Sequence, residues 1–232
     1  MKKKLINMLV KMPEGFQKFV ARKYMDSVFK NKVELKVNGE ENLPKKNEPI
    51  IFICNHLSNI DGPTLDRVIG QYDPIYVAGQ KLSGDNLTKL FIGIYRNETI
   101  KPDTPDKGAM KRIIKSLKDG ESIVIFPEGT RSRSGQMIEG KRGIMLIARL
   151  SKAKIVPIAM HGNEKILPIS KSGDMSSESI NEGTININIG KPFYVRERRK
   201  NETKNDYDID VMDEIMKSIA NMLPETYRGF YK

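Results

Sequence analysis

The sequence predicts an α/β fold, with a mostly parallel central sheet flanked by helices and an N-terminal amphipathic helical segment. Short apolar runs such as residues 50–54 have the composition of central strands covered on both faces. Longer segments with helical periodicity alternate with these runs, as is typical of a parallel sheet with helical connections. The 232 residues are enough to bury one sizeable core.

The N-terminal segment, residues 1–32, is expected to be helical, with a break at residues 13–15 (Pro-Glu-Gly). Its apolar stripe has a lysine at the edge and consists of Phe16, Phe19, Val20, Lys23 and Tyr24. Basic residues outnumber acidic ones here, a pattern typical of helices that lie on an anionic membrane surface. The alternative is that these helices pack on the domain with their lysines in solvent.

Strands are expected where apolar residues alternate with polar ones or form short runs. In chain order, these segments are residues 33–38, 50–54, 74–78, 99–100, 122–126, 155–160 and 184–189. The helical segments between and after them are residues 64–70, 84–97, 107–118, 143–151 and 206–223. Together they predict one α/β domain over residues 33–232, after the segment 1–32.

Charge and composition limit the classes of partner. The formal net charge of +11 favours anions such as nucleic acid, anionic lipid or a phosphorylated substrate. Nucleic acid is disfavoured, because the chain lacks tryptophan and shows no interleaving of aromatic and basic residues. A single cysteine, Cys54, excludes an intramolecular disulfide, fits a reducing compartment and is expected to be buried. With only two histidines besides, we expect no metal site.

No window approaches the roughly 20 apolar residues that a transmembrane helix needs. The N-terminus begins like a signal peptide, but no small-residue cleavage site follows. We therefore expect no transmembrane span and a peripheral, monotopic position on a membrane.

A histidine and a carboxylate, His56 and Asp61, follow the apolar run 50–54. Parallel sheets place ligand sites at the carboxyl ends of their strands. Histidine accepts a proton near neutral pH, and a carboxylate on its other nitrogen fixes the tautomer, so the pair fits activation of a hydroxyl group. No Gly-x-Ser-x-Gly motif marks a serine nucleophile, which favours direct attack by the acceptor. Alternatively, Asp61 only caps the next helix and His56 is an ordinary loop residue.

A second motif, residues 126–132 (Phe-Pro-Glu-Gly-Thr-Arg-Ser), follows another predicted core strand. Its proline ends the strand, and Gly129 permits close approach of a ligand to the backbone. Arg131 can bind a phosphate through two parallel hydrogen bonds. Alone, this motif favours a charged surface loop over a binding site.

The two motifs together, Asn-His-x4-Asp (residues 55–61) and Phe-Pro-Glu-Gly-Thr-Arg-Ser about 70 residues later, resemble the glycerolipid acyltransferase family. The resemblance extends over residues 34–192 and is strongest to the bacterial enzymes that acylate 1-acyl-glycerol-3-phosphate. It implies an acyltransferase domain at 33–232, with His56 as general base and Asp61 as its orienting partner. It implies acceptor binding by Glu128, Gly129, Thr130, Arg131 and Lys81, and a pocket lined by Val156, Pro157 and Ile158.

The resemblance also implies a reaction: an acyl group passes from acyl-CoA or acyl carrier protein to this lysophospholipid, giving phosphatidic acid, without a cofactor. The site is expected on the cytoplasmic face of the cell membrane. One departure concerns the family's second block, whose arginine is absent from residues 96–103, so that Lys101 or Arg96 is expected to substitute. This leaves two alternatives open: another lysophospholipid acceptor, or a non-catalytic basic membrane-binding module of the same fold.

Overall fold

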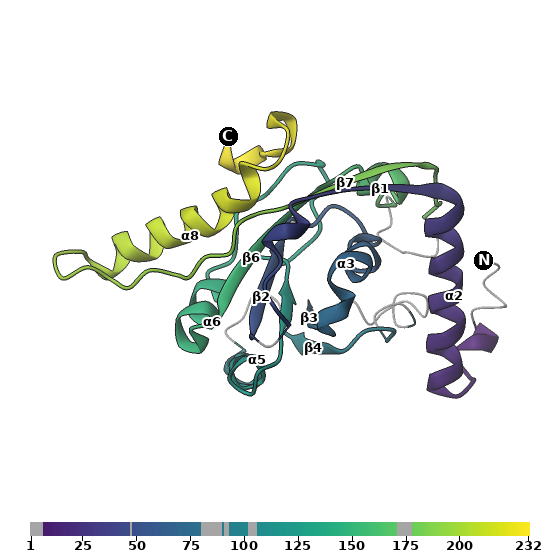
Figure 1. Cartoon of the computed structure of the whole chain (residues 1–232), viewed down its shortest axis with the longest axis horizontal. Coiled ribbons are helices and arrows are strands. Elements are labelled where there is room, and N and C mark those ends of the chain that lie inside the picture. The colour runs from purple at the N-terminus through teal and green to yellow at the C-terminus, as the bar shows by residue number, and fades with distance from the viewer. Residues whose placement is uncertain (1–6, 47, 80–89, 91–92, 102–105, 171–177) are drawn as a thin grey trace.

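The computed structural model describes residues 7–46, 48–79, 90, 93–101, 106–170 and 178–232. Within these residues the chain forms a seven-stranded sheet with the order β1-β7-β6-β2-β5-β3-β4 (Figure 1). The strands are β1 (Val33–Asn38), β2 (Ile50–Cys54), β3 (Ile75–Gly79), β4 (Asn97–Ile100), β5 (Ile123–Ile125), β6 (Lys154–His161) and β7 (Gly183–Ile189). Every neighbouring pair is parallel except β6 and β7, which confirms the predicted mostly parallel sheet.

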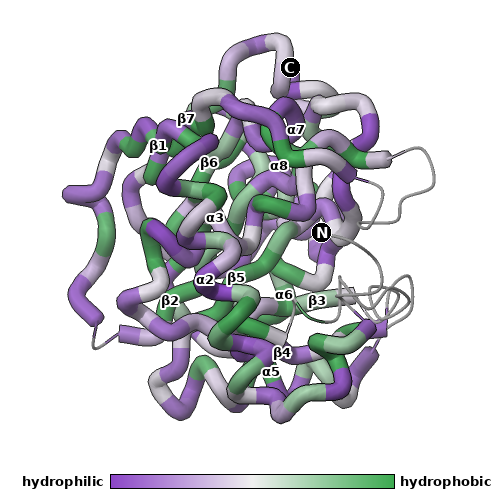
Figure 2. Tube along the Cα trace, turned by 90° about the vertical axis from the view of Figure 1, so that its right-hand side faces the viewer, coloured by the Kyte–Doolittle hydropathy of each residue, from purple (hydrophilic) through white to green (hydrophobic). Residues whose placement is uncertain are grey.

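Two layers of helices cover the sheet. The helices are α2 (Glu14–Lys32), α3 (Asp61–Ile69), α5 (Lys107–Lys118), α6 (Gly143–Ser151), α7 (Asn163–Ile166) and α8 (Lys204–Ala220). Alternate residues of β2 serve the two faces: Ile50 and Phe52 pack with α2 and α3, whereas Ile51 and Ile53 pack with α5, α6 and α8. The central strands are therefore apolar on both faces, and their segments appear green in Figure 2.

Most element boundaries agree with the sequence prediction, but one predicted helix is wrong at its C-terminal end. Residues 93–96 form a turn and a bend and are not helical, and Asn97 begins β4 instead of ending a helix. The backbone there pairs with β3, where Tyr76 aligns with Asn97, and this pairing replaces helical hydrogen bonds. Within the predicted helix, residues 84–89 and 91–92 lie outside the described residues.

Helix α2 has two apolar faces. Ala21, Met25, Val28 and Phe29 are buried in the same core as the sheet. Four large side chains on the preceding turns and the opposite face are exposed: Met8, Met12, Phe16 and Phe19, the last two by 47% and 58%. No helix in the described part of the chain has the length and apolarity that crossing a bilayer requires.

Candidate active site

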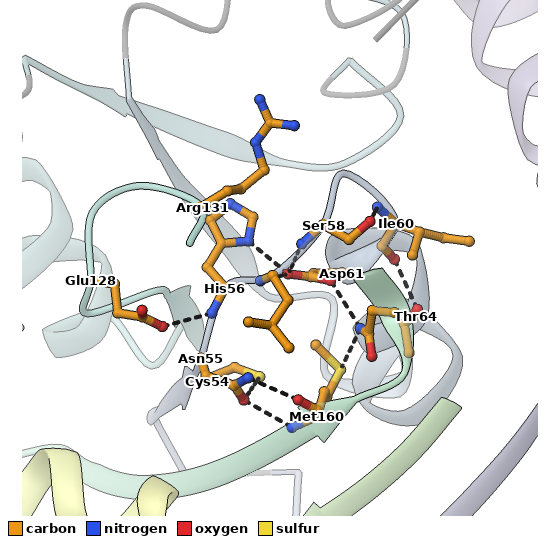
Figure 3. A network of polar contacts seen from close by, with 12 residues as sticks. Cys54, Asn55, His56, Ser58, Ile60, Asp61, Thr64, Glu128, Arg131 and Met160 are labelled. Atoms are coloured by element: carbon orange, nitrogen blue, oxygen red, sulfur yellow. Dashed lines mark hydrogen bonds and ion pairs between the residues drawn. The ribbon is translucent and has the colours of Figure 1, made fainter. Parts of the chain in front are cut away.

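The sheet topology brings the two sequence motifs together. β2 and β5 are parallel neighbours, with Ile53 aligned to Ile125, so the segments after them leave the same edge of the sheet. We call residues 55–60, which follow β2, the histidine loop and residues 126–132, which follow β5, the arginine loop. Their convergence is visible in Figure 3.

The histidine and aspartate form a hydrogen-bonded pair. Nδ1 of His56 lies 2.7 Å from Oδ2 of Asp61, and the Asp61 side chain is fully buried. Because a carboxylate only accepts, the hydrogen of a neutral His56 lies on Nδ1, which leaves Nε2 free to accept a proton. Asp61 is the first residue of α3 and makes no capping bond to it, so the alternative of a mere helix cap is wrong.

Further hydrogen bonds fix the orientation of the Asp61 carboxylate. Oδ2 accepts from the backbone N–H groups of Leu57 at 2.8 Å and Ser58 at 3.0 Å. Oδ1 accepts from the amide Nδ2 of Asn163 at 2.9 Å. The carboxylate therefore holds the histidine loop in a tight turn while it contacts the imidazole.

Asn163 is a site residue that the sequence reasoning missed. It begins α7, directly after Gly162 at the end of β6, and is fully buried. Asn55 belongs to the first motif, although the sequence assigns it no role; it bonds both backbone groups of Met160 on β6, at 2.8 and 2.9 Å. Asn55 thus attaches the histidine loop to β6, and Asn163 attaches Asp61 to α7. The sequence of the loop alone does not indicate either contact.

The arginine loop holds the backbone of His56 from the other side. The His56 N–H donates to Oε1 of Glu128, and the His56 carbonyl accepts from the N–H of Ser132, both at 2.8 Å. The ring of Phe126 stacks on the imidazole, with centroids 4.0 Å apart and an interplanar angle of 17°. Ring position is therefore determined by both loops together.

Glu128 is placed differently from its predicted role at the acceptor. Its side chain is fully buried, and its second oxygen accepts from the backbone N–H of Ile138 at 2.8 Å. The pKa of Glu128 is raised to about 7, chiefly by burial and also by the nearby Asp61 charge, against the effect of the two backbone hydrogen bonds. The carboxyl group joins the two loops rather than facing a substrate.

The remaining residues of the arginine loop lie nearer the surface. Gly129 has φ +71°, a left-handed conformation that favours glycine, and Thr130 is exposed. The Arg131 side chain is 16% exposed, and its Nη1 lies 3.4 Å from Oε1 of Glu178. Arg131 thus lies near His56 (Figure 3), and its role as a phosphate ligand stays a prediction.

The structure separates the two proposed substitutes for the missing arginine. Arg96 precedes β4, at the amino edge of the sheet, and binds Glu121 at 2.7 Å and Asp73 at 3.2 Å. Its expected role is wrong, because it lies at the edge opposite to the loops. Lys101 follows β4 at the correct edge, but three strand spacings of about 4.8 Å put it roughly 14 Å along the sheet from β2. Lys81 lies outside the described residues.

The predicted pocket residues lie in the core. Val156, Pro157 and Ile158 are buried on β6, where they align with Phe52, Ile53 and Cys54 of β2. Cys54 is buried as expected. That the three β6 residues line an acyl or acceptor pocket stays a prediction. The described residues contain no group of three or more metal-ligating side chains.

Comparisons with known proteins match the part of the chain that carries this site. The model of the family described as Acyltransferase matches residues 34–161, which include both loops. The chain is 32% identical over 141 residues to the 1-acyl-sn-glycerol-3-phosphate acyltransferase of Bacillus subtilis, covering 61% of this chain and 69% of that one. It is 28% identical over 180 residues to a chloroplastic 1-acyl-sn-glycerol-3-phosphate acyltransferase of Brassica napus, covering 77% and 51%.

A solved structure shares the fold. The 1-acyl-sn-glycerophosphate acyltransferase PlsC of Thermotoga maritima superposes with a TM-score of 0.64 at 20% identity, over 90% of this chain and 80% of that one. The chain spans about half the length of the chloroplastic relatives it matches.

Proposed function

We propose that this chain, which belongs to the acyltransferase family, transfers a fatty acyl group to the free hydroxyl of 1-acyl-glycerol-3-phosphate, giving phosphatidic acid. The observation that carries this proposal is the buried Asp61 carboxylate on Nδ1 of His56, next to Arg131. The names of the relatives in Bacillus and Brassica support the choice of acceptor.

The geometry supports a direct transfer. The acceptor hydroxyl would donate to Nε2 of His56, which takes its proton as the oxygen attacks the thioester carbonyl. Asp61 stabilises the imidazolium that forms. When the tetrahedral intermediate collapses, the C–S bond breaks and the thiolate takes the proton back from Nε2. Acyl-CoA and acyl carrier protein both supply such a thioester, and both are proposed donors.

Arg131 is the proposed ligand of the acceptor phosphate. Its guanidinium carries several donors in a planar arrangement that matches phosphate oxygens. Its backbone neighbour Ser132 is bonded to His56, so the phosphate would be held at a fixed distance from the base. Fixed spacing between the charged group and the reacting hydroxyl is what orients a small acceptor.

A second acceptor class is favoured by one observation. Arg96 is held by Glu121 and Asp73, so it does not supply a second arginine to the phosphate. A lysophospholipid with a phosphodiester head group carries less charge there than a phosphomonoester, and one arginine suffices for it. Such a lysophospholipid is the alternative acceptor.

The proposed location is the cytoplasmic face of the cell membrane, with α2 and the turns before it on an anionic surface. The exposed Met8, Met12, Phe16 and Phe19 would enter the interface. Nearby lysines support this orientation: Nζ of Lys23 lies 5.9 Å from the ring centroid of Phe19. Because an acceptor with one acyl chain resides in the bilayer, surface contact also delivers substrate.

The test is acyl transfer from a radiolabelled long-chain acyl-CoA, or from acyl carrier protein, to a panel of lysophospholipids in mixed micelles. Turnover of 1-acyl-glycerol-3-phosphate that is lost in His56→Ala supports the proposal. Turnover of another lysophospholipid alone reassigns the acceptor. No turnover from folded protein that still binds vesicles identifies a non-catalytic membrane module.

A further inference from the structure

Glu178 lies against the proposed phosphate site and has no role in the reaction described above. It follows β6 and α7 in the chain and is 47 residues from Arg131. Its side chain is 0% exposed. A buried carboxylate is costly unless it is paired or hydrogen-bonded, so its partners indicate what it does.

The carboxylate of Glu178 is shared between the two loops. Oε2 accepts from Nδ2 of Asn59 in the histidine loop at 2.7 Å. Oε1 lies 3.4 Å from Nη1 of Arg131 and 3.4 Å from the backbone N–H of Ser170. The bond to Asn59 is short, whereas the contact with Arg131 is at the upper limit for a hydrogen bond.

This arrangement matches what an anionic acceptor needs. A carboxylate presents two acceptor oxygens to a guanidinium, as two oxygens of a phosphate do. Glu178 therefore stands where a phosphate bound to Arg131 would place its negative charge. Two anions at one guanidinium repel each other, so the acceptor and Glu178 compete.

We propose that Glu178 is an internal counter-ion of the acceptor site, whose carboxylate stays at Arg131 until the anionic group of the acceptor replaces it. This inference rests on the proposed function, because it takes Arg131 as the phosphate ligand. Glu178 neutralises Arg131 in the free protein and thereby sets the acceptor affinity. The apparent affinity equals the intrinsic affinity multiplied by the fraction of molecules in which Glu178 has left Arg131. This factor is the same for every acceptor that uses Arg131.

The experiment is calorimetric titration of the full chain with sn-glycerol 3-phosphate. Glu178→Gln keeps the shape of the side chain and removes its charge, so we expect the Kd to fall about tenfold, the effect of one charge-assisted hydrogen bond. The matched control is Glu182→Gln, which removes the same charge from an exposed side chain four residues along the chain. We expect no change in that variant.

A double-mutant cycle assigns the effect to Arg131. In an Arg131→Gln background, the change at Glu178 should no longer alter the Kd, because the guanidinium for which Glu178 and the acceptor compete is absent. The same cycle, read as the KM for 1-acyl-glycerol-3-phosphate in mixed micelles, should show the same tenfold change, with the KM for acyl-CoA unaltered. Far-ultraviolet circular dichroism of each variant verifies the fold.

Unchanged or weaker binding of glycerol 3-phosphate by folded Glu178→Gln, with unchanged or higher KM, overturns the inference. The same holds if the effect persists in the Arg131→Gln background. If the wild type transfers acyl groups while Glu178→Gln has no effect, the proposed function stands and only this inference fails. If Glu178→Gln binds more tightly but no variant transfers acyl groups, the reaction fails and the anion exchange at Arg131 stands.

Discussion

His56 owes its position to both loops: Glu128 and Ser132 hold its backbone, Phe126 its ring face, and Asp61 its Nδ1.

Asp61→Asn tests the charge with little change of shape. The new amide can be accommodated, because the Asn163 amide can rotate and accept from it through Oδ1, which has no partner among the described residues. We expect normal stability and a kcat about 10² to 10⁴ lower, since no charge stabilises the imidazolium. A melting curve and steady-state kinetics check both; an active variant would contradict the proposed role.

Asn163 contacts Asp61 and would act on the proposed reaction through it, as a positioning residue. Asn163→Ala removes the donor to Oδ1, so the carboxylate loses one of its fixed contacts. We expect kcat to fall about tenfold, corresponding to a hydrogen bond to a charged group, with the KM values unchanged. The acidic limb of the pH–rate profile should move as well, because the Asp61 carboxylate that faces His56 loses a hydrogen-bond donor to its charge. Asn201→Ala, at an exposed position, is the control; an unshifted profile with lower stability would indicate a purely structural role.

Glu128 makes stability depend on pH. Its pKa is about 7 in the folded state against 4.5 ordinarily, so the folded state binds the proton more tightly than the unfolded state does. This contribution is present in full below about pH 4.5 and is lost as the pH rises through 7. From pH 4.5 to 8, we expect the free energy of unfolding of the wild type to fall relative to Glu128→Gln by about 3 kcal/mol. Urea unfolding of both proteins measures this difference, and parallel pH dependences would refute the prediction.

At the scale of the element, α2 has a buried face and an exposed apolar face. Phe16→Ser with Phe19→Ser removes two exposed rings. Burying the apolar surface of each ring would contribute about 1.5–3 kcal/mol to binding. We expect at least tenfold weaker binding to phosphatidylglycerol vesicles and unchanged stability, because neither ring is in the core. Vesicle sedimentation measures the binding. Ile209→Ser on α8, an exposed apolar residue in the helix layer on the other face of the sheet (Figure 1), should bind like the wild type.

The sequence predicts best the elements that are uniformly buried. Residues 50–54 have the predicted strand boundaries because this strand is buried on both faces and every side chain is apolar. β4 was predicted as only two residues, because its partly exposed residues, Asn97 to Ile100, lack such a run. Its start is set by pairing with β3, and pairing partners cannot be read from one segment.

At the scale of the whole molecule, the net charge of +11 acts together with α2. Binding to anionic vesicles should weaken as salt rises from about 50 to 500 mM, since the Debye length shortens severalfold over that range. Part of the binding should persist, because the apolar contact of Phe16 and Phe19 is not screened. Sedimentation at several salt concentrations checks this. Binding that is independent of salt would mean that the charge plays no part at the membrane.

The two motifs that predict the site follow neighbouring parallel strands, β2 and β5. Contact between them is therefore predictable once the fold is known. The partners Asn163 and Glu178 could not be expected. They lie 102 and 47 residues from the groups they bind, Asp61 and Arg131, and neither belongs to a recognisable pattern. The error at Arg96 has the same origin. The edge of the sheet at which Arg96 lies depends on where β4 begins and on its direction, and neither follows from the spacing between Arg96 and the motifs.

The position of β1 has a consequence for synthesis. β1 pairs with β7, with Val33 aligned to Gly183, although about 150 residues separate them in the chain. On the ribosome, α2 and β1 emerge long before β7 exists, so the exposed apolar face of α2 is available to a lipid surface while β1 has no partner. Asp61 is likewise synthesised before its partner Asn163, and Arg131 before its partner Glu178. If α2 binds the membrane as proposed, a nascent chain would reach the membrane first and would complete the proposed site only near the end of translation.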